Sequence, residues 1–512
     1  MSKNIVLLIL LSSVCYSQQI RPNIIFIFSD DHDQRAISAY GNALIKTPNI
    51  DRIAQNGTVF ENSFCTNSIC APSRAVILTG KHSHLNSVPD NRNETRFDSS
   101  QVTFPKILKE NGYTTAIVGK WHLKSNPTGF DYWEILNDQG QYYNPEFISK
   151  EGARIRNGYA TDLTTDLAIN FLKDRDKSKP FLLMCQNKAP HRNFMPKIKY
   201  IGMYDSVLFP LPATFNRDYT KMGSAAQEQK QSIAKDMMPV YDLKLFPAIA
   251  LANSLSGIND KNPYFAWLSE AKRLNPEEME KWVNAYMPRQ IEFLQIPKDE
   301  KSIAEWKFQS FMRDYMATIY SVDENVGRLL DYLDQNNLAQ NTIVVYSSDQ
   351  GFWLGENGWF DKRFMFEKSM RMPLIVKWPG VTDKNKRVTQ MVQNLDYAQT
   401  FLEMAGIKSP SDMQGKSLVP LLKDPNVQWD RDYLYYQYFE YPDAHRVQPH
   451  YGIRSNEYKL IYFPLHNEWE FYNLKADPDE QYNLIGESGL KKTIAIHKLR
   501  LNELRKQYLV KP

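Results

Sequence analysis

The chain has few cysteines and little excess charge. Its 512 residues include four cysteines, and because Cys15 lies in an N-terminal leader, an odd number remains after cleavage. That count excludes a scaffold built on disulfides, although Cys65 and Cys185 could pair. The formal net charge of +4 is small and evenly spread. We therefore expect no binding to nucleic acid.

Long apolar runs, internal repeats and low-complexity tracts are also missing. The one apolar run at the start, Ile5 to Leu11, follows Lys3 and precedes small residues around Ser17. This pattern predicts a signal peptide over residues 1–17, cleaved near Ser17. The run is too short for a permanent membrane anchor. We expect no integral membrane span elsewhere and a mature protein that is periplasmic or secreted.

The length exceeds one hydrophobic core and predicts two domains. Continuous apolar runs alternate with amphipathic patterns, of which the strongest runs from about Trp306 to Gln335. Runs of this kind are typical of strands covered on both faces, so we predict an α/β fold with a mostly parallel sheet. The predicted strands are Asn23 to Ser29, Thr114 to Val118, Pro180 to Cys185, Thr342 to Ser347 and Pro373 to Val376.

Composition divides the chain further. We assign a catalytic domain to 18–425 and a C-terminal subdomain to 430–512, where short strands followed by a helix predict an α+β unit with an antiparallel sheet. Residues 215–301 are polar and charged, with a helical pattern and no strand signal. This insertion is either a surface excursion, which we favour, or a wall of a substrate cleft.

Four of the predicted strands end in residues that carry chemistry. The endings are Asp30-Asp31-His32, Gly119-Lys120-Trp121-His122, Lys188-Ala189-Pro190-His191 and Ser348-Asp349-Gln350-Gly351. Ligands of open α/β sheets bind beyond the carboxyl ends of the strands. We therefore expect these four endings to meet in one site.

Asp30, Asp31 and Asp349 would repel one another in such a site unless a cation lay between them. With Gln350 they offer oxygen ligands, which suit a hard cation, Ca²⁺ or Mg²⁺. The alternative is that the pair Asp30-Asp31 is a turn and helix cap.

The pentapeptide Cys70-Ala71-Pro72-Ser73-Arg74 precedes an apolar run and reads as the start of a helix. A thiol at a helix N-terminus has a lowered pKa and raised reactivity, and Arg74 adds positive charge. The alternative is a half-buried structural cysteine. Histidines near strand ends, His122 and His191, are candidates for proton transfer or for a structural hydrogen bond.

The pentapeptide resembles the C-x-P-S-R signature of the type I sulfatases, in the alkaline phosphatase superfamily. The resemblance covers nearly the whole mature chain, including Leu78-Thr79-Gly80 and Leu474-Lys475-Ala476-Asp477-Pro478. It implies an alkaline-phosphatase-like fold, with a large mixed, mostly parallel sheet covered by helices and a smaller C-terminal domain. It also implies that a maturation enzyme oxidises Cys70 to formylglycine (3-oxoalanine), whose hydrate attacks sulfur.

The resemblance also implies roles for the other residues. One calcium ion would be bound by Asp30, Asp31, Asp349, Gln350 and the modified residue 70. Arg74 would hold the diol of residue 70, while Lys120 and Lys362 would bind sulfate. His122 would be the base that regenerates the aldehyde, and His191 would protonate the leaving alcohol. One departure is Asn357, because many sulfatases have a histidine at this position.

The predicted substrate is a sulfated polysaccharide or oligosaccharide. The chain looks most similar to bacterial enzymes of the N-acetylglucosamine-6-sulfatase type, and an algal polymer such as ulvan is the alternative. Rival functions are a phosphoesterase of the same superfamily and a non-catalytic sugar-binding homologue. The candidate substrate-binding residues are Lys120, His191, Asp361, Lys362, Arg363, His450 and Arg454.

Overall fold

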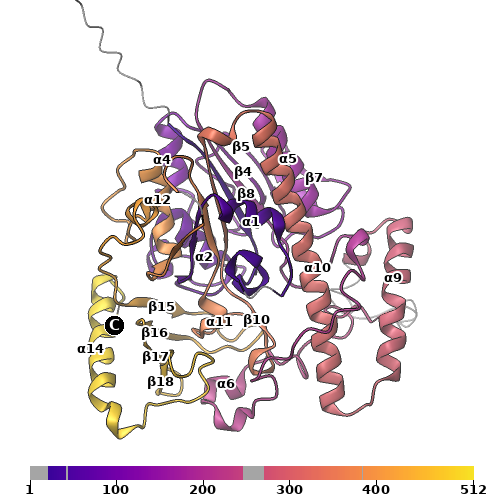
Figure 1. The fold of residues 1–512 in the computed structure, drawn as a ribbon, viewed down its shortest axis with the longest axis vertical. Coiled ribbons are helices and arrows are strands. Elements are labelled where there is room, and N and C mark those ends of the chain that lie inside the picture. The colour runs from indigo at the N-terminus through magenta and orange to yellow at the C-terminus, as the bar shows by residue number, and fades with distance from the viewer. Residues whose placement is uncertain (1–20, 42–43, 246–269, 383–384, 512) are drawn as a thin grey trace, which may run out of the picture.

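The protein has a large central sheet between two layers of helices, with a small sheet beside it (Figure 1). A computed structural model describes residues 21–41, 44–245, 270–382 and 385–511. The large sheet has ten strands in the order β13-β2-β12-β9-β1-β8-β4-β5-β6-β7. Its strands are β1 (Asn23–Ser29), β2 (Thr58–Phe60), β4 (Thr114–Lys120), β5 (Tyr132–Leu136), β6 (Glu146–Ser149), β7 (Gly152–Ile155), β8 (Phe181–Asn187), β9 (Thr342–Ser348), β12 (Leu374–Lys377) and β13 (Lys386–Val388).

The centre of this sheet is parallel. β1 pairs with β8 and β9, and β8 continues through β4 to β5, all in the same direction. β12 and the hairpin β6–β7 are antiparallel. The prediction of a mixed, mostly parallel sheet is therefore confirmed.

Alternate side chains of β1 enter two separate cores, as its continuous apolar sequence predicts. Ile24, Phe26 and Phe28 belong to one buried cluster, whereas Ile25 and Ile27 belong to another. Helices α2, α4 and α12 pack together over the first cluster, and α1, α5 and α10 pack over the second.

Most of the helices in the described residues lie before the C-terminal unit. They are α1 (Pro48–Gln55), α2 (Cys70–Thr79), α3 (Ser83–Asn86), α4 (Phe104–Glu110), α5 (Ala160–Asp174), α6 (Ser224–Glu228), α9 (Pro276–Gln295), α10 (Glu300–Gln335), α11 (Glu367–Met370), α12 (Tyr397–Met404) and α13 (Val419–Lys423). The predicted helix near 306–335 begins earlier, because the Asp299 side chain accepts a hydrogen bond from the backbone N–H of Ser302. None of the helices in these ranges has the length and hydropathy of a membrane span.

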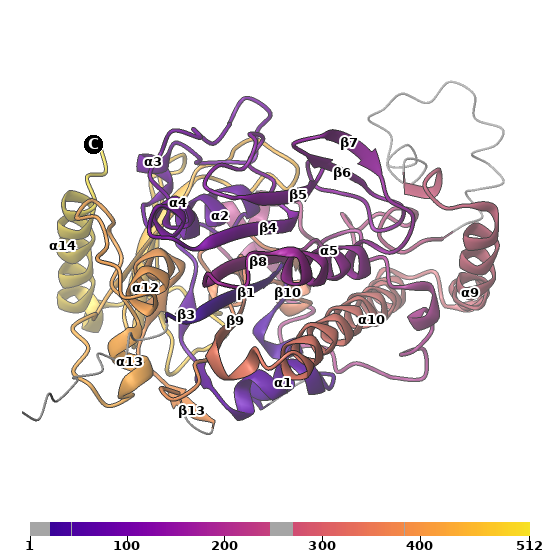
Figure 2. The same ribbon diagram turned by 90° about the horizontal axis from the view of Figure 1, so that it is seen from above.

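The C-terminal unit is an antiparallel sheet covered by a helix, as predicted. Its strands are β15 (Leu434–Tyr438), β16 (His450–Arg454), β17 (Tyr458–Phe463) and β18 (Glu468–Asn473), and α14 (Lys491–Gln507) packs against them. Figure 2 places α14 and α9 at opposite ends of the molecule. Two short ladders complete the fold, β3 (Ser63–Phe64) with β14 (Val392–Gln393) and β10 (Trp353–Leu354) with β11 (Phe360–Asp361).

Part of the segment 215–301 is buried. Its described part contains α6 and α9, but Gln231, Asp242 and Lys244 are buried, and Ser232 forms a β-bridge with Trp359. Helix α9 also buries Trp282 and Tyr286 completely. These side chains pack toward α10, whereas most of α9 is exposed, and the choice between a surface excursion and a cleft wall stays a prediction. Residues 246–269 of the insertion and the predicted leader, 1–17, lie outside the described residues.

The three cysteines after the leader are buried and unpaired. Cys65 and Cys185 therefore do not form the disulfide that the sequence left open.

Candidate functional site

The site lies at the carboxyl edge of the parallel strands. Ser29 at the end of β1 pairs with Asn187 of β8 and Ser348 of β9, so Asp30 and Asp349 follow neighbouring strands at the same level. β4 ends at Lys120, and a glycine precedes it because a Cβ at Gly119 would lie 1.9 Å from the main-chain oxygen of Gln186. The predicted meeting of the four strand endings is thus observed.

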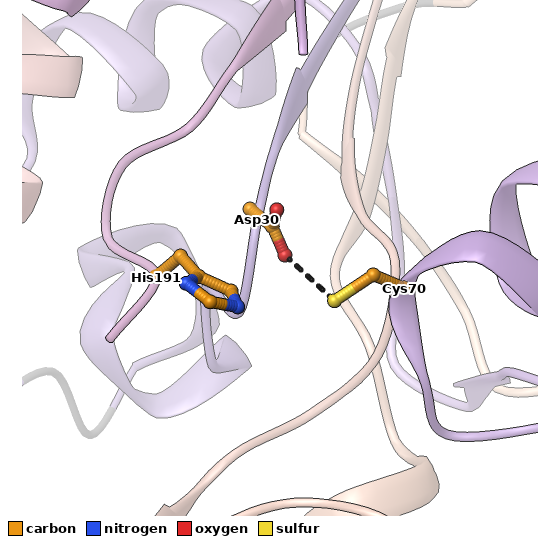
Figure 3. A group of neighbouring side chains, drawn as sticks. All are labelled: Asp30, Cys70 and His191. Carbon is orange, nitrogen blue, oxygen red and sulfur yellow. Dashed lines mark hydrogen bonds between the residues drawn. The ribbon is translucent and has the colours of Figure 1, made fainter. Parts of the chain in front are cut away.

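Three carboxylates and a thiol lie together at this edge. One ligand atom from each of Asp30, Asp31, Asp349 and Cys70 lies within 4.8 Å of the others, and all four residues are buried. The backbone N–H of Asp31 donates to Oδ1 of Asp349 at 3.0 Å. Figure 3 shows the Cys70 thiol and the His191 ring directed toward Asp30, with Cys70 Sγ 3.4 Å from Asp30 Oδ1.

Helix α2 presents Cys70 as its first residue, as the sequence predicts. The expected lowering of the thiol pKa is wrong, however. Burial removes water from the thiol, and the adjacent Asp30 carboxylate opposes a second negative charge, so both raise the pKa of Cys70. An unmodified Cys70 is therefore a protonated thiol and a poor nucleophile.

Three cations are paired with the acids. Lys120 contacts Asp30, Lys362 Nζ lies 2.7 and 2.6 Å from the two carboxylate oxygens of Asp31, and Arg74 lies 3.3 Å from Asp30 and 3.5 Å from Asp349. Arg74 is further fixed by Gln186 at 2.7 Å. The ion pairs of Arg74 are with the acids, and it also donates to the main-chain oxygen of Lys120 at 2.8 Å; within the described residues it makes no hydrogen bond to Cys70.

The acids differ in their electrostatic surroundings. Burial tends to raise the pKa of Asp30, but Lys120, His191 and Arg74 together hold it well below the usual range. Burial and the Asp30 charge raise the pKa of Asp349 well above that range. Burial also raises the pKa of Asp31 to about 6, against the lowering effect of Lys362. The cluster thus carries more negative charge than its neighbours stabilise.

The two histidines are buried beside these groups. His191 Nδ1 lies 2.5 Å from the main-chain oxygen of Arg192, which makes Nδ1 the donor and leaves Nε2, 3.8 Å from Asp31 Oδ2, without the proton. His122 Nε2 lies 3.7 Å from Asp138, and its buried Nδ1 has no hydrogen-bond partner in the part of the chain that the structure describes. Burial first, and Lys120 second, lower the pKa of both rings well below the usual value.

The donor set fits a hard cation. Gln350 donates its amide N–H to Asp31, which leaves Oε1 buried with no hydrogen-bond partner among the described residues. An oxygen of this kind, next to three carboxylates, is suited to Ca²⁺ or Mg²⁺. The residues predicted as metal ligands are therefore brought together.

Asp361 and Arg363 flank Lys362, and hydrogen bonds and ion pairs hold their side chains in place. Asp361 Oδ1 accepts from the Lys362 backbone N–H at 2.8 Å and from Arg363 Nε at 3.1 Å, while its Oδ2 lies 3.2 Å from His445 Nε2. Arg363 contacts Tyr438 and Glu440 of the C-terminal unit. The small sheet thus reaches the site through these residues.

The contacts of His450 and Arg454 oppose the substrate-binding role predicted for them. His450 Nε2 accepts from the Met365 backbone N–H at 2.9 Å and Nδ1 lies 2.7 Å from the Gln448 oxygen, so both ring nitrogens are occupied. Arg454 is buried against Glu367. Both side chains hold the small sheet against the large domain instead.

Asn357, the departure from the family pattern, also faces away from the acids. Its Oδ1 accepts from Arg217 at 3.0 Å, and its backbone N–H donates to Thr214. Its hydrogen bonds therefore hold the segment near residue 215 in place and do not orient a metal ligand.

Sequence reasoning missed two side chains beside the site, Asp138 and Gln139, and gave no role to Lys188, which it had named in a strand ending. Asp138 and Gln139 follow β5, a strand that was not predicted, and contact His122 and Lys120. Lys188 is 4% exposed, and burial lowers its pKa to about 8. The rule that polar residues follow parallel strands would have identified Asp138 and Gln139 had β5 been recognised.

Comparison with known families identifies the class. A sulfatase family model matches residues 22–407, and a model of the C-terminal part of N-sulphoglucosamine sulphohydrolase matches residues 355–507. The chain belongs to the sulfatase family and is a sulfuric ester hydrolase.

Two individual relatives and one solved structure are similar to this chain over most of its length. The chain is 46% identical to an N-acetylglucosamine-6-O-sulfatase of Bacteroides thetaiotaomicron, over 95% of this chain and 87% of the relative. It is 26% identical to a ulvan-active sulfatase of Formosa agariphila, over 91% of this chain and 77% of the relative. A solved structure of BT4656 in complex with its substrate D-glucosamine-2-N,6-O-disulfate matches with 46% identity and a TM-score of 0.90, covering 95% of this chain and 98% of that one.

Proposed function

We propose that this sulfatase hydrolyses 6-sulfate esters of glucosamine residues in sulfated polysaccharides or oligosaccharides. The support for this substrate is the difference in identity, 46% to the N-acetylglucosamine-6-O-sulfatase against 26% to the ulvan-active enzyme. The single observation that carries the chemistry is the cluster of Asp30, Asp31, Asp349 and Cys70 within 4.8 Å, surrounded by three paired cations.

In this proposal residue 70 is converted to formylglycine by a maturation enzyme. The hydrated aldehyde supplies a hydroxyl nucleophile for sulfur, which the buried, protonated thiol does not. The conversion must precede complete folding, since Cys70 is 1% exposed in the folded chain.

A calcium ion would be held by the carboxylates of Asp30, Asp31 and Asp349 and by Oε1 of Gln350. It would supply the positive charge that the acids lack and polarise a sulfate oxygen. The unpartnered Gln350 Oε1 supports this assignment, because a buried amide oxygen otherwise loses a hydrogen bond.

Lys120 and Lys362 would stabilise charge on the sulfate oxygens. Both ammonium groups are buried, where fixed charges act more strongly than in water. Arg74 would keep Asp30 and Asp349 in place rather than hold residue 70, as its contacts indicate.

His191 would donate a proton to the leaving alcohol from Nε2. Its Nδ1–H is committed to the Arg192 oxygen, so Nε2 is the nitrogen that gains and gives the proton. Burial first, and then Lys120 and Lys362, lower the pKa of this ring, and a bound sulfate would oppose the effect of the two lysines. His122 would accept the proton that turnover removes.

Asp361 and Arg363 remain the candidates for contacts with sugar hydroxyls. They flank Lys362 in the sequence, and their side chains are hydrogen-bonded to each other. Removal of the leader over residues 1–17 would place the enzyme in the periplasm or outside the cell, where it would meet such polymers. N-terminal sequencing of the mature protein tests the cleavage site.

The test of function uses protein produced with the maturation enzyme. We expect sulfate release from N-acetylglucosamine-6-sulfate, much slower release from sulfated ulvan oligosaccharides, and none of phosphate from phosphate esters. The peptide that contains residue 70 should have the mass of formylglycine. Release of sulfate by protein with an ordinary thiol at residue 70 would overturn the mechanism, and a preference for ulvan would overturn the substrate.

A further inference from the structure

The loop between β5 and β6 contacts two functional side chains at once. The Asp138 carboxylate lies 3.7 Å from His122 Nε2, and Gln139 Oε1 accepts from Lys120 Nζ at 2.6 Å. Asp138 and His122 both have left-handed backbones, with φ of 49° and 56°. Strained conformations of this kind persist where the surrounding structure determines them, often at functional sites.

Asp138, whose side chain is 60% exposed, lies 3.7 Å from His122 Nε2, beyond a direct hydrogen bond, and its charge favours one tautomer of His122. A neutral imidazole carries one proton, and a carboxylate beside Nε2 stabilises that proton on Nε2. The other nitrogen, Nδ1, is buried and has no hydrogen-bond partner among the described residues. Burial lowers the pKa of the ring most, Lys120, Arg74 and Lys124 lower it further, and Asp30 opposes them, so the ring is neutral.

Gln139 fixes the position of Lys120 in a similar way. Lys120 is fully buried and contacts Asp30, and the Gln139 amide oxygen accepts a second hydrogen bond from its ammonium group. The main-chain oxygen of Gln139 in turn lies 3.3 Å from Lys188 Nζ, which stands 4.9 Å from the centre of the Tyr142 ring. The backbone of the loop is therefore held by a hydrogen bond from a buried lysine.

We propose that Asp138 and Gln139 are positioning residues of this sulfatase. Asp138 holds the Nε2–H tautomer of His122, so that Nδ1 is the nitrogen that accepts the proton removed during turnover. The resulting imidazolium keeps its Nε2–H against the Asp138 carboxylate, and no other proton moves. Gln139 directs the Lys120 ammonium group. The catalytic part of this inference rests on the proposed function.

The first experiment reads the tautomer without activity. In protein labelled with ¹⁵N-histidine, a His122→Gln variant identifies the His122 signals, and we expect Nε2 to be protonated and Nδ1 unprotonated. Asp138→Asn should shift the ring toward the Nδ1–H tautomer, because the amide N–H can donate to Nε2. Asn137→Ala is the matched control, since the Asn137 side chain, in the same loop, donates to Glu146 instead.

The second experiment measures catalysis by the matured enzyme. Asp138→Asn should lower kcat roughly 10- to 100-fold, as is typical when a partner that orients a functional histidine is lost, with little change in KM. Gln139→Ala should raise KM and lower kcat together, and Gln139→Glu, which keeps an acceptor oxygen, should recover part of the loss. Asn137→Ala should match the wild type in both constants.

The outcomes separate the two proposals. If Asp138→Asn and Asn137→Ala give the same ¹⁵N pattern and the same kcat as the wild type, the positioning role is wrong, whatever the enzyme's substrate. If the matured wild type hydrolyses no sulfate ester, the proposed function is wrong, and the ¹⁵N pattern still decides whether Asp138 sets the His122 tautomer.

Discussion

Two of the buried clusters of acids and bases in the described part of the chain differ in how completely they are paired. In the first, at the sheet edge, Asp30, Asp31 and Asp349 face Arg74, Lys120 and Lys362. In the second, between the large domain and the small sheet, Glu367 and Glu480 face Arg371, Arg454 and Lys459. We call this second group the Glu367 cluster.

Each charged side chain of the Glu367 cluster has a charged partner, although burial still raises the pKa of Glu480. Glu367 is bound by Arg454 and Lys459, each at 2.9 Å, and by Arg371 at 2.7 Å. Burial tends to raise the pKa of Glu367, but these cations hold it well below the usual range. None of the charged side chains of this cluster has an unpartnered buried atom in the described structure.

The site at the sheet edge lacks such completeness. The pKa of Asp349 is raised, as that of Glu480 is in the Glu367 cluster, because burial and Asp30 outweigh Arg74. The difference lies in the polar atoms, since Gln350 Oε1 and His122 Nδ1 have no hydrogen-bond partners among the described residues. Buried charged side chains therefore occur in structural clusters as well as in functional sites. Buried polar atoms without hydrogen-bond partners are the better indication of a ligand-binding site.

The largest effect is expected from Cys70→Ala. Losing the nucleophile should reduce sulfate release by about 10⁴-fold or more, with the fold unchanged because the residue is small. Cys185→Ala, which removes another buried cysteine, is the matched control and should keep full activity per folded molecule. Residual turnover in Cys70→Ala close to that of the wild type would show that residue 70 is not the nucleophile.

Removal of calcium by a chelator should inactivate the enzyme and lower its melting temperature. A ligand present at about 1,000 times its Kd stabilises the folded state by roughly 4 kcal/mol. Differential scanning fluorimetry with added Ca²⁺ or Mg²⁺ measures the recovery and identifies the ion. Asp349→Asn should abolish the response, and a response that survives in this variant would place the ion elsewhere.

Glu367→Ala should destabilise the protein without changing its chemistry. Removing one partner of a buried ion pair costs about 3–5 kcal/mol, because the opposing charges stay buried. We expect a lower urea midpoint with an unchanged kcat for the molecules that remain folded. A selective loss of kcat would show that the Glu367 cluster takes part in catalysis.

In the presence of calcium, Lys362→Ala should lower kcat strongly and change the stability of the protein little, which is the opposite of the result expected for Glu367→Ala. Loss of one group that stabilises transition-state charge costs about 10²- to 10³-fold in kcat. Lys459→Ala, which removes an equally buried lysine from the Glu367 cluster, should mainly lower stability. If Lys362→Ala shifts the melting temperature as much as Lys459→Ala and keeps its rate, the contrast between the two clusters fails.

The smallest effect concerns pH. Burial raises the pKa of Glu470, in β18, from 4.5 to about 7. Between these values the folded state retains a proton that the unfolded state has lost, so stability falls as pH rises through that window. Glu470→Gln should flatten this part of the melting-temperature curve. Glu468→Gln, in the same strand, tests whether any carboxylate of β18 gives the same result.

Much of the fold could be predicted because its signals are local. The apolar runs of β1, β4, β8 and β9 predict strands covered on both faces, and the structure agrees within two residues at each end of these four strands. Strand β5 and the hairpin β6–β7 were missed. Strand β7 is exposed along its whole length and carries no apolar pattern that would mark it.

The pKa of Cys70 could not be predicted from its place in the helix. The helix start favours a thiolate, but burial and Asp30, which lies 40 residues away in sequence, oppose it more strongly. The contacts of His450 and Arg454 could not be predicted for a similar reason. A donor-rich segment reveals the chemistry of its side chains but not whether partners such as Met365 and Glu367 already occupy them.

The sequence by itself determined the class of enzyme, the order of strands and helices along the chain, and the residues at the four strand endings. These follow from local patterns and from a short signature around Cys70. Only the tertiary structure decided which charges are paired, which nitrogen of each histidine is free, and that the loop of Asp138 and Gln139 belongs to the site. Such properties depend on distances between residues far apart in the chain, which hydrophobic periodicity does not encode.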